Sequence, residues 1–569
     1  MDINLGRLGF ADQGLYSPGL AYVKRDVVTY LGSTYRCVAN TAPGQDPVTY
    51  PASWVLMAKG TSTVYTAKGD MITFDGANLT RLGIGTQGQT LGVNNGMPIW
   101  MAPQARPGTV AAALAYNPNG TSCSYAGLPV IMSDGSVKMW GQSSNYCVGD
   151  MSNSNVINPQ PVSFDPNNPP TFPIVQVATC YMTNYALDSA GRVFAWGYNS
   201  YGQLGQGDTT NRAIATQINW FVQQGVQIAA IIVAREGGVS ASNGSAWFLT
   251  TTGTVYGVGY NAYGQLGNGT TSNSSLPARC GTISGIAKVF VGGMDMASVF
   301  AIDTGNKLWA WGYNAYGQLG LGDATNRSTP MQVPNITNAK KVCCTNGYAG
   351  PYVTDTAVLC TDGSIYVCGW NGQGALGMGD TTTRYGFTKI PIATFTPADI
   401  ELYGGYYDSL WVIDTVGHLW ACGYNGYGQL GTGDTTNRSS LVQIGSGQPW
   451  DGKAVRLKAG GGQCASSQYV FAVLMDSTTK LWSAGYNGSG QLAVGDTSQR
   501  ATFTRVLGPR PTEQMGVIDY TTGGYSSSGR LWVLSADGRL WGAGDNTGYS
   551  LGTQCNNNRW EGRLSDVDF

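Results

Sequence analysis

The 569-residue chain has little charge, and its Lys and Arg are not clustered. Charged residues make up 11%, with 32 basic against 33 acidic side chains. Because nucleic acids and anionic membranes are bound by clustered cations, this pattern excludes both kinds of partner. No stretch approaches the ~20 apolar residues of a membrane span, and residues 1–19 lack the apolar run of a signal peptide. We therefore expect a protein made in the cytoplasm, without membrane insertion and not exported by the secretory route.

Histidine is nearly absent, and the cysteines follow no framework. His418 is the only histidine, and the 12 cysteines form no CxxC pair. A catalytic histidine or a His-rich metal site is excluded by this count. The sequence predicts no cofactor, no metal site and mostly free thiols.

Glycine and aromatic residues are abundant instead. The chain has 82 Gly, 32 Tyr and 16 Trp. Tyr and Trp favour strands and Gly favours tight turns, so this composition indicates many short strands.

A 17-residue phrase, WGYNAYGQLGLGDATNR at 311–327, recurs along the chain. Six copies keep most of it and two outer copies are degenerate. The glycine at its second position occurs at Gly141, Gly197, Gly259, Gly312, Gly369, Gly423, Gly485 and Gly544, with a mean spacing of about 58 residues. Cys368 and Cys422 begin their copies where others have Trp, which predicts small buried side chains.

A predicted β-hairpin precedes each phrase. In SVFAIDTGNKLWAWG, 298–312, two apolar-alternating runs flank a Gly-Asn turn. About four short strands per repeat is typical of a β-propeller blade. The fold class is therefore predicted as all-β, a propeller of seven or eight four-stranded blades, with eight favoured by the number of phrases.

The phrase also contains a repeated carboxylate, four residues before an Arg. A Ca²⁺ loop or an acid–base pair would show such a residue, but so would an Asp that binds its own following backbone. Because one active site needs no fivefold carboxylate, we interpret these residues as turn formers: Asp208, Asp323, Asp380, Asp434 and Asp496. The Gly and Leu of GQLG are expected to pack each blade on the next.

The hairpin, WG, Asn, GQLG and GD pattern resembles the regulator-of-chromosome-condensation repeat over residues 110–569. This resemblance implies a propeller of about seven blades. The family commonly carries a His after paired glycines, before the first hairpin strand. Here those stretches read GGMDMASVFAI (292–302) and GGYYDSLWVI (404–413). The family's nucleotide-exchange activity at chromatin is therefore not expected.

Residues 20–58 suggest a three-strand module that resembles the small carbohydrate-binding module of chitinases, also found in phage tail proteins. The resemblance rests on Tyr22, Asp26, Val27, Val28, Tyr30, Gly32, Tyr35 and Trp54. It implies that exposed aromatics such as Tyr30 and Trp54 stack on sugar rings. The alternative is that these side chains form the module's miniature core.

Residues 68–102 resemble a linker segment of bacteriophage tail fibres, which implies an intertwined, often trimeric β-shaft. Their GxGxxG, Gly83 to Gly88, is not interpreted as a dinucleotide site, because no βαβ unit surrounds it. The predicted domains are 1–60, a carbohydrate-binding-like β module; 61–104, a β-shaft; and 105–569, the propeller.

These resemblances together imply a phage tail fibre or receptor-binding protein in the virion. We expect attachment to a bacterial surface glycan or receptor, other tail or baseplate proteins as partners, a homotrimer as one oligomeric option, and no catalysis. One alternative is a polysaccharide-cleaving tailspike, whose carboxylate pair would come from Glu236, Asp295, Asp355, Glu401 and Asp408. Another is a structural or decoration protein of the virion.

In six phrases an aromatic residue follows the glycine at the second position. These candidate ligand-binding residues are Tyr198, Tyr260, Tyr313, Trp370, Tyr424 and Tyr486, together with Tyr30 and Trp54 of the N-terminal module. Equivalent positions in successive blades predict a ring at one rim, where aromatic faces suit sugar surfaces. The alternative is that the rings only cover the Asn turn that follows them.

Overall fold

The computed structural model describes residues 128–551 with gaps, and parts of the chain outside that range. The gaps are 181, 234–243, 294–295, 346–353, 405–406, 465–466, 509–515, 524–528, 537 and 547–550. Before residue 128 it describes strands between 11 and 114 and residues 21, 39–43, 45–47 and 52; after 551 it describes 565–566. The chain divides into two compact units, 1–104 and 105–569.

The first unit is built of short strands. One sheet has the order β1 (Ala11–Leu15), β2 (Asp26–Tyr30), β3 (Ser33–Cys37) and β4 (Trp54–Ala58), and β1 pairs parallel to β2. Two hairpins follow, β5 (Met71–Phe74) with β6 (Leu79–Leu82), and β7 (Thr90–Asn94) with β8 (Met97–Met101). The sheet has one strand more than the three predicted, because ADQGL lies before the alternating runs and its Gly14 weakens the strand pattern.

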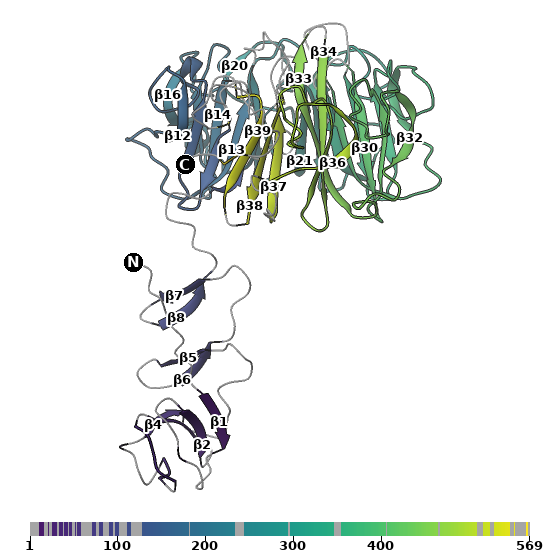
Figure 1. Ribbon diagram of the computed structural model, residues 1–569. Helices are drawn as coiled ribbons and strands as arrows, with labels where there is room; N and C mark the ends of the chain where they lie inside the picture. The colour runs from purple at the N-terminus through teal and green to yellow at the C-terminus, as the bar shows by residue number, and fades with distance from the viewer. Residues whose placement is uncertain are drawn as a thin grey trace. The chain divides into compact units, whose positions relative to one another are not determined.

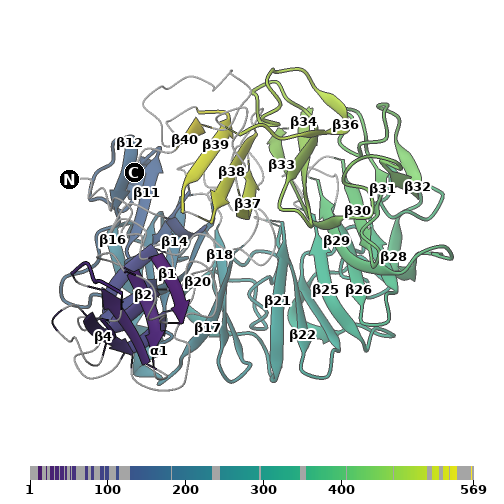
Figure 2. The same cartoon turned by 60° about the horizontal axis from the view of Figure 1, so that its bottom comes forward.

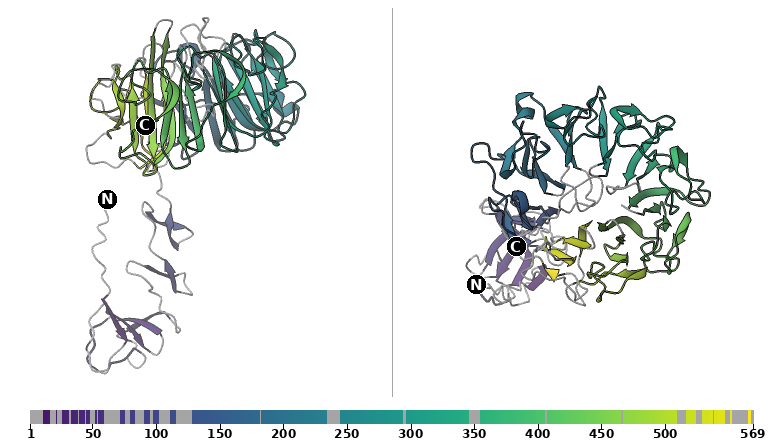
Figure 3. Two further views of the ribbon diagram at one scale, coloured as in Figure 1. Left: turned by 90° about the vertical axis from the view of Figure 1, so that its right-hand side faces the viewer. Right: turned by 90° about the horizontal axis from the view of Figure 1, so that it is seen from above.

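The second unit is a propeller of eight four-stranded antiparallel blades. Figures 1 and 2 show its blades arranged in a ring. Seen from above in Figure 3, the blades form a ring with the innermost strands nearest its axis. The innermost strands are β9 (Ala111–Leu114), β13 (Ile174–Cys180), β17 (Ile228–Val233), β21 (Ile286–Gly292), β25 (Ala339–Cys344), β29 (Pro397–Tyr403), β33 (Ala454–Cys464) and β37 (Val517–Gly523).

Each blade continues outward in chain order. The second strands are β10 (Val130–Met132), β14 (Thr183–Asp188), β18 (Ser245–Thr250), β22 (Ser298–Asp303), β26 (Asp355–Cys360), β30 (Ser409–Asp414), β34 (Ser467–Asp476) and β38 (Arg530–Ser535). The third strands are β11 (Val137–Gly141), β15 (Val193–Gly197), β19 (Val255–Gly259), β23 (Leu308–Gly312), β27 (Ile365–Gly369), β31 (Leu419–Gly423), β35 (Leu481–Gly485) and β39 (Leu540–Gly544). The outer strands are β12 (Val156–Pro161), β16 (Arg212–Gln217), β20 (Ser274–Arg279), β24 (Arg327–Gln332), β28 (Arg384–Lys389), β32 (Arg438–Ile444), β36 (Arg500–Arg505) and β40 (Ser565–Asp566).

The prediction of an all-β propeller with eight blades is confirmed. Within the described residues, helix is confined to one turn of 3₁₀ helix, Ser144–Tyr146, and to α1 (Asn219–Gln223). No described helix is long and apolar enough to span a bilayer. The ring closes where blade 8 packs on blade 1, and Trp532 and Leu540 share one apolar cluster with Trp140.

The phrase joins neighbouring blades through its glycines. A Cβ on Gly264 would lie 2.5 Å from the Cα of Ser328, in the outer strand of the next blade. The Gly269 N–H donates a hydrogen bond to the Ser328 carbonyl at 2.8 Å, and the phrases of blades 2, 4, 5 and 6 repeat this bond. The predicted packing of GQLG against the following blade is therefore confirmed, and its close approach explains the glycine.

The tryptophan that begins the phrase reaches back to the preceding blade. Trp311 Nε1 donates to the Gln265 carbonyl at 2.9 Å, and Trp196 Nε1 makes the equivalent bond to Cys147 at 3.1 Å. Cys368 Sγ instead lies 3.3 Å from the Gln318 carbonyl, so the cysteine occupies the tryptophan's place. Eight cysteines with described side chains are free and buried, which agrees with the predicted free thiols and with the predicted burial of Cys368 and Cys422.

The apolar phrase positions expected inside the propeller lie there. Trp196, Trp311, Leu204, Leu319 and Leu430 have no exposed surface. Trp311 is buried against the preceding blade and Leu319 against the following one, so a phrase is part of the cores that join its blade to both neighbours.

Replacing Leu319 by Ala is expected to lower the free energy of unfolding by about 2–5 kcal/mol, because a fully buried leucine leaves a cavity. Leu276→Ala is the matched control, since that side chain is 43% exposed, and should change stability by less than about 0.5 kcal/mol. Chemical denaturation measures both. Equal stability of the parent and Leu319→Ala would contradict the packing described above.

Candidate functional site

The six predicted aromatic residues lie at one face of the propeller. Each follows the glycine that ends a third strand, and all third strands end at the same face because the blades repeat. The backbone fixes the position: Tyr313 N–H donates to the Ala297 carbonyl at 3.0 Å, and Tyr424 N–H donates to that of Asp408 at 2.8 Å. Their side chains are half-buried, so part of each ring reaches the surface.

Neighbouring phrases connect through a second tyrosine that sequence reasoning missed. Tyr201 contacts Tyr260 of the next blade edge-on at 5.4 Å, and Tyr263 contacts Tyr313 in the same way at 5.1 Å. We call the connected rings the aromatic belt: Tyr201, Tyr260, Tyr263 and Tyr313 in one run, and Tyr407, Tyr424, Tyr427, Tyr469 and Tyr486 in another. The tyrosine three residues after the first, in YNxYGQLG, is the signal that could have found these partners.

The aromatic residues adopt two arrangements, selected by the residue two positions later. The rings of Trp370, Tyr424 and Tyr486 lie where a Cβ on Gly372, Gly426 or Gly488 would be. These three rings therefore cover their own turns, as the alternative interpretation proposed. In the other three copies that glycine is replaced by Ser200, Ala262 and Ala315, so a ring cannot occupy the same place.

The belt is electrically neutral. Burial raises the pKa of the Tyr313 hydroxyl to about 12, and it also raises the pKa values of Tyr424 and Tyr486. These three hydroxyls therefore stay protonated and can both donate and accept hydrogen bonds.

The aromatic series stops at the junction of blades 8 and 1. Gln142 and Asp545 stand in place of the aromatic residue there. Arg530 Nη2 lies 2.8 Å from Asp545 Oδ2, and the two side chains are 4% and 7% exposed. The face thus has an aromatic arc and one polar junction.

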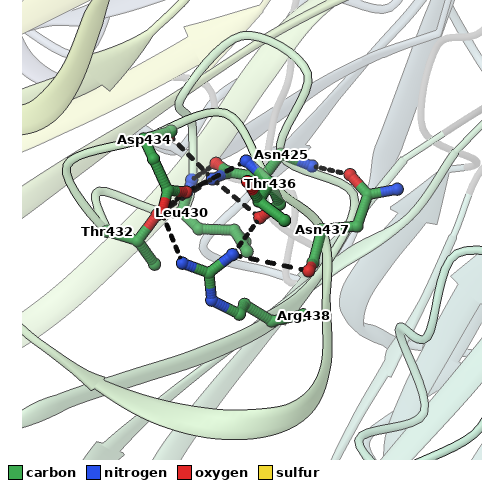
Figure 4. Close-up of polar contacts among 7 residues, drawn as sticks. All are labelled: Asn425, Leu430, Thr432, Asp434, Thr436, Asn437 and Arg438. Atoms are coloured by element: carbon green, nitrogen blue, oxygen red, sulfur yellow. Dashed lines mark hydrogen bonds and ion pairs between the residues drawn. The ribbon is translucent and has the colours of Figure 1, made fainter.

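A buried asparagine holds the turn beneath each aromatic residue, shown for Asn425 in Figure 4. Its Nδ2 donates to the carbonyls of Asp434 and Thr436 at 2.9 and 3.2 Å, and its Oδ1 accepts from Leu430 N–H at 3.0 Å. One side chain therefore binds both ends of the turn.

The repeated aspartate completes this turn. Asp434 Oδ1 accepts from Thr436 N–H at 2.9 Å, and Asp434 Oδ2 pairs with Arg438 Nη2 at 2.6 Å (Figure 4). The Arg438 guanidinium and the Thr436 N–H lower the pKa of Asp434 to about 2. The same bond to the backbone recurs at Asp208, Asp323, Asp380 and Asp496. The turn interpretation of these carboxylates is confirmed.

Two of the five other acidic candidates come together under this face. Asp355 begins β26 and Asp408 directly precedes β30, and both side chains are buried. The two carboxyl groups are removed from solvent and lie beside each other. Burial and the neighbouring Asp408 carboxyl hold the pKa of Asp355 well above its usual range, and burial raises the pKa of Asp408 to about 7.

The other blades show why Asp355 is unusual. At its position Ser298 and Ser409 use their hydroxyls to donate to the carbonyls of Tyr313 and Tyr424, both at 2.8 Å. Only a protonated Asp355 could donate in the same way. The pair therefore favours retention of a proton.

The remaining candidates are Glu401, Glu236 and Asp295. Glu401 is buried in β29, and Glu236 and Asp295 lie outside the described residues. Tyr30 and Trp54 lie in β2 and β4, but their side chains are outside the described part of the chain. Among the residues that the structure describes, no cluster of three metal-ligating side chains occurs.

Comparison with known proteins identifies the propeller's family. Residues 82–466, more than half of the chain, match the model of the RCC1-like domain. The chain belongs to this family. The predicted repeat type is thus confirmed, with eight blades instead of the seven that the resemblance implied.

The relatives of this RCC1-like chain are diverse. It is 27% identical over 377 residues to the ultraviolet-B receptor UVR8 of Arabidopsis thaliana, covering 65% of this chain and 77% of that protein. It is 28% identical over 285 residues to the human probable E3 ubiquitin-protein ligase HERC4, covering 50% of this chain but 20% of the ligase. The structure of human WBSCR16 shares the fold, with a TM-score of 0.51 at 16% identity, and covers 70% of this chain and 98% of that one.

The Asp355–Asp408 pair predicts stability that falls as pH rises. Both pKa values lie above the ~3.9 of an unfolded aspartate, so the folded chain binds more protons between about pH 4 and 7. The stabilisation is complete below pH 4 and is lost as pH rises through about 7, with a slope of up to about 1.4 kcal/mol per pH unit per proton.

Asp408→Asn, which keeps a neutral donor there, should reduce this slope in denaturation measured from pH 5 to 8. Asp323→Asn is the control, because that carboxylate's pKa is lowered and it titrates only in acid. An unchanged slope in Asp408→Asn would show that the pair does not share a proton.

Proposed function

We propose that the RCC1-like propeller is a glycan-recognition platform and that the protein is the receptor-binding protein of a bacteriophage tail. The observation that carries the proposal is the aromatic belt. Its rings lie half-buried at one face and belong to rigid turns. A rigid scaffold that presents aromatic side chains loses little conformational entropy on binding.

The chemistry of the belt favours a sugar over a charged ligand. Its hydroxyls remain protonated, as the raised pKa values of Tyr313, Tyr424 and Tyr486 indicate. Aromatic faces contact the C–H surface of a sugar ring, while phenolic hydroxyls exchange hydrogen bonds with sugar hydroxyls.

The tail assignment is supported by the resemblance of residues 68–102 to tail-fibre linkers and of residues 20–58 to a carbohydrate-binding module. The first unit would then attach the propeller to other tail or baseplate proteins, in a homotrimer or singly. Two of the relatives are named as a light receptor and a ubiquitin ligase, and these activities belong to those proteins.

The geometry favours glycan binding without glycan cleavage over the tailspike alternative. Glycosidases place two carboxylates about 5–9.5 Å apart on either side of the substrate. Asp355 and Asp408 are instead adjacent and buried, with 1% and 0% of their surfaces exposed. The tailspike alternative would therefore need carboxylates other than this pair.

The first test removes two connected rings of the belt. Tyr424→Ala/Tyr427→Ala should weaken adsorption to host cells, or binding to purified surface glycan, by about tenfold or more, because aromatic anchors typically contribute over 1 kcal/mol each. Tyr385→Ala is the control, since Tyr385 is 46% exposed on the outer strand β28 and outside the belt. A folded double variant that adsorbs like the parent would rule out the belt as the binding surface.

The second test addresses catalysis. Incubation of the protein with host surface polysaccharide should release no new reducing ends, because Asp355 and Asp408 are buried away from a substrate. Steady release of oligosaccharides would instead establish the tailspike alternative.

A further inference from the structure

Side chains on the innermost strands reach from one blade to the next and join them. In the blade 2 strand, Gln176 donates to the Ile231 carbonyl at 2.7 Å and accepts from its N–H at 2.9 Å. Lys341 donates to Asp399 Oδ1 at 2.8 Å, and Arg456 pairs with Asp519 at 3.0 Å. The third residue of the innermost strand makes these contacts in each case.

Blade 3 departs from this pattern. From β13 to β37 the third residues are Gln176, Ala230, Lys288, Lys341, Asp399, Arg456 and Asp519. Ala230 alone in this series is apolar, and its methyl group is too short to reach the next blade. The boundary between blades 3 and 4 therefore lacks the polar side chain that bridges the neighbouring boundaries at this position.

A cavity of about 430 Å³ lies at this boundary. Its apolar lining includes Ala230, Ile232, Ala287 and Phe290, from β17 and β21. This volume is about three times that of an engineered ~150 Å³ cavity that holds benzene. It is also within the range of small-molecule sites.

Lysines complete the lining on one side. Lys288 Nζ donates one hydrogen bond, to the Lys340 carbonyl at 3.1 Å, and Lys340 Nζ donates one, to the Ala398 carbonyl at 2.9 Å. Neither ammonium pairs with a carboxylate among the described residues, whereas Lys341 is paired with Asp399. Because an ammonium has three donors, Lys288 and Lys340 each retain two.

We propose that this cavity binds an anionic amphiphile, a small carboxylate with an apolar body of about ten carbon atoms. The apolar body lies in the cavity against Ala230 and Phe290, and the carboxylate binds Lys288 and Lys340. The site lies at the start of the innermost strands. Innermost and third strands run in the same direction, so the cavity and the aromatic belt lie toward opposite faces, and this site is independent of the proposed glycan binding.

Decanoate is the probe for the full-length chain, with decanol as its uncharged match. Titration calorimetry should show saturable one-to-one binding of decanoate tighter than about 1 mM, and at least about tenfold weaker binding of decanol. Absence of saturable binding, or equal affinity for the two compounds, would overturn the proposal.

Two variants locate the site. Ala230→Gln supplies the side chain that blade 2 has at this position, so it should place a polar group in the apolar lining, keep the fold and weaken decanoate binding by about tenfold or more. Lys288→Met/Lys340→Met should weaken it by about tenfold or more. Lys307→Met is the matched control, since Lys307 is an exposed lysine of the blade 4 hairpin turn, and should bind as the parent does. Unchanged binding in Ala230→Gln or in the double lysine variant would contradict the assignment.

Discussion

The propeller depends on the hydrogen bonds that a buried asparagine makes within the repeated phrase. Its side chain binds the backbone at both ends of a turn, as Asn425 does, and so fixes the leucine inside and the glycines against the next blade. Asn546 accepts the equivalent bond from Leu551 N–H in blade 8, at 2.8 Å. In blade 1 Ser143 takes this place and donates to the Ser152 carbonyl at 3.0 Å. A buried amide with most of its capacity satisfied rigidifies the loop around it.

This rigidity gives the two faces of the propeller different properties. At one face the turns present aromatic rings at regular intervals, because each ring follows a fixed strand end. Toward the other, the beginnings of the innermost strands carry the polar bridges between blades. The repeated phrase forms the first face, whereas the second varies from blade to blade, from Gln176 to Asp519.

The departures from the repeat have physical consequences. A cysteine in place of tryptophan, at Cys368, preserves a contact with the same carbonyl with a smaller side chain. An aspartate in place of serine, at Asp355, puts a carboxyl beside Asp408 in a buried place and raises the pKa values of both. An alanine in place of a polar residue, at Ala230, leaves a cavity. Each of these substitutions changes the chemistry of one blade and leaves the ring of eight blades intact.

The sequence by itself determined the strand-rich composition, the eight repeats, the role of Asp434 as a turn former and the face that Tyr198 and its equivalents share. These follow from local rules, since a phrase that recurs in the sequence must recur in space. Only the tertiary structure decided that Tyr201 contacts Tyr260, that Asp355 meets Asp408, and that Ala230 and Lys340 line one cavity. Those pairs lie in different blades, and their contacts depend on how blades pack, which no single repeat encodes.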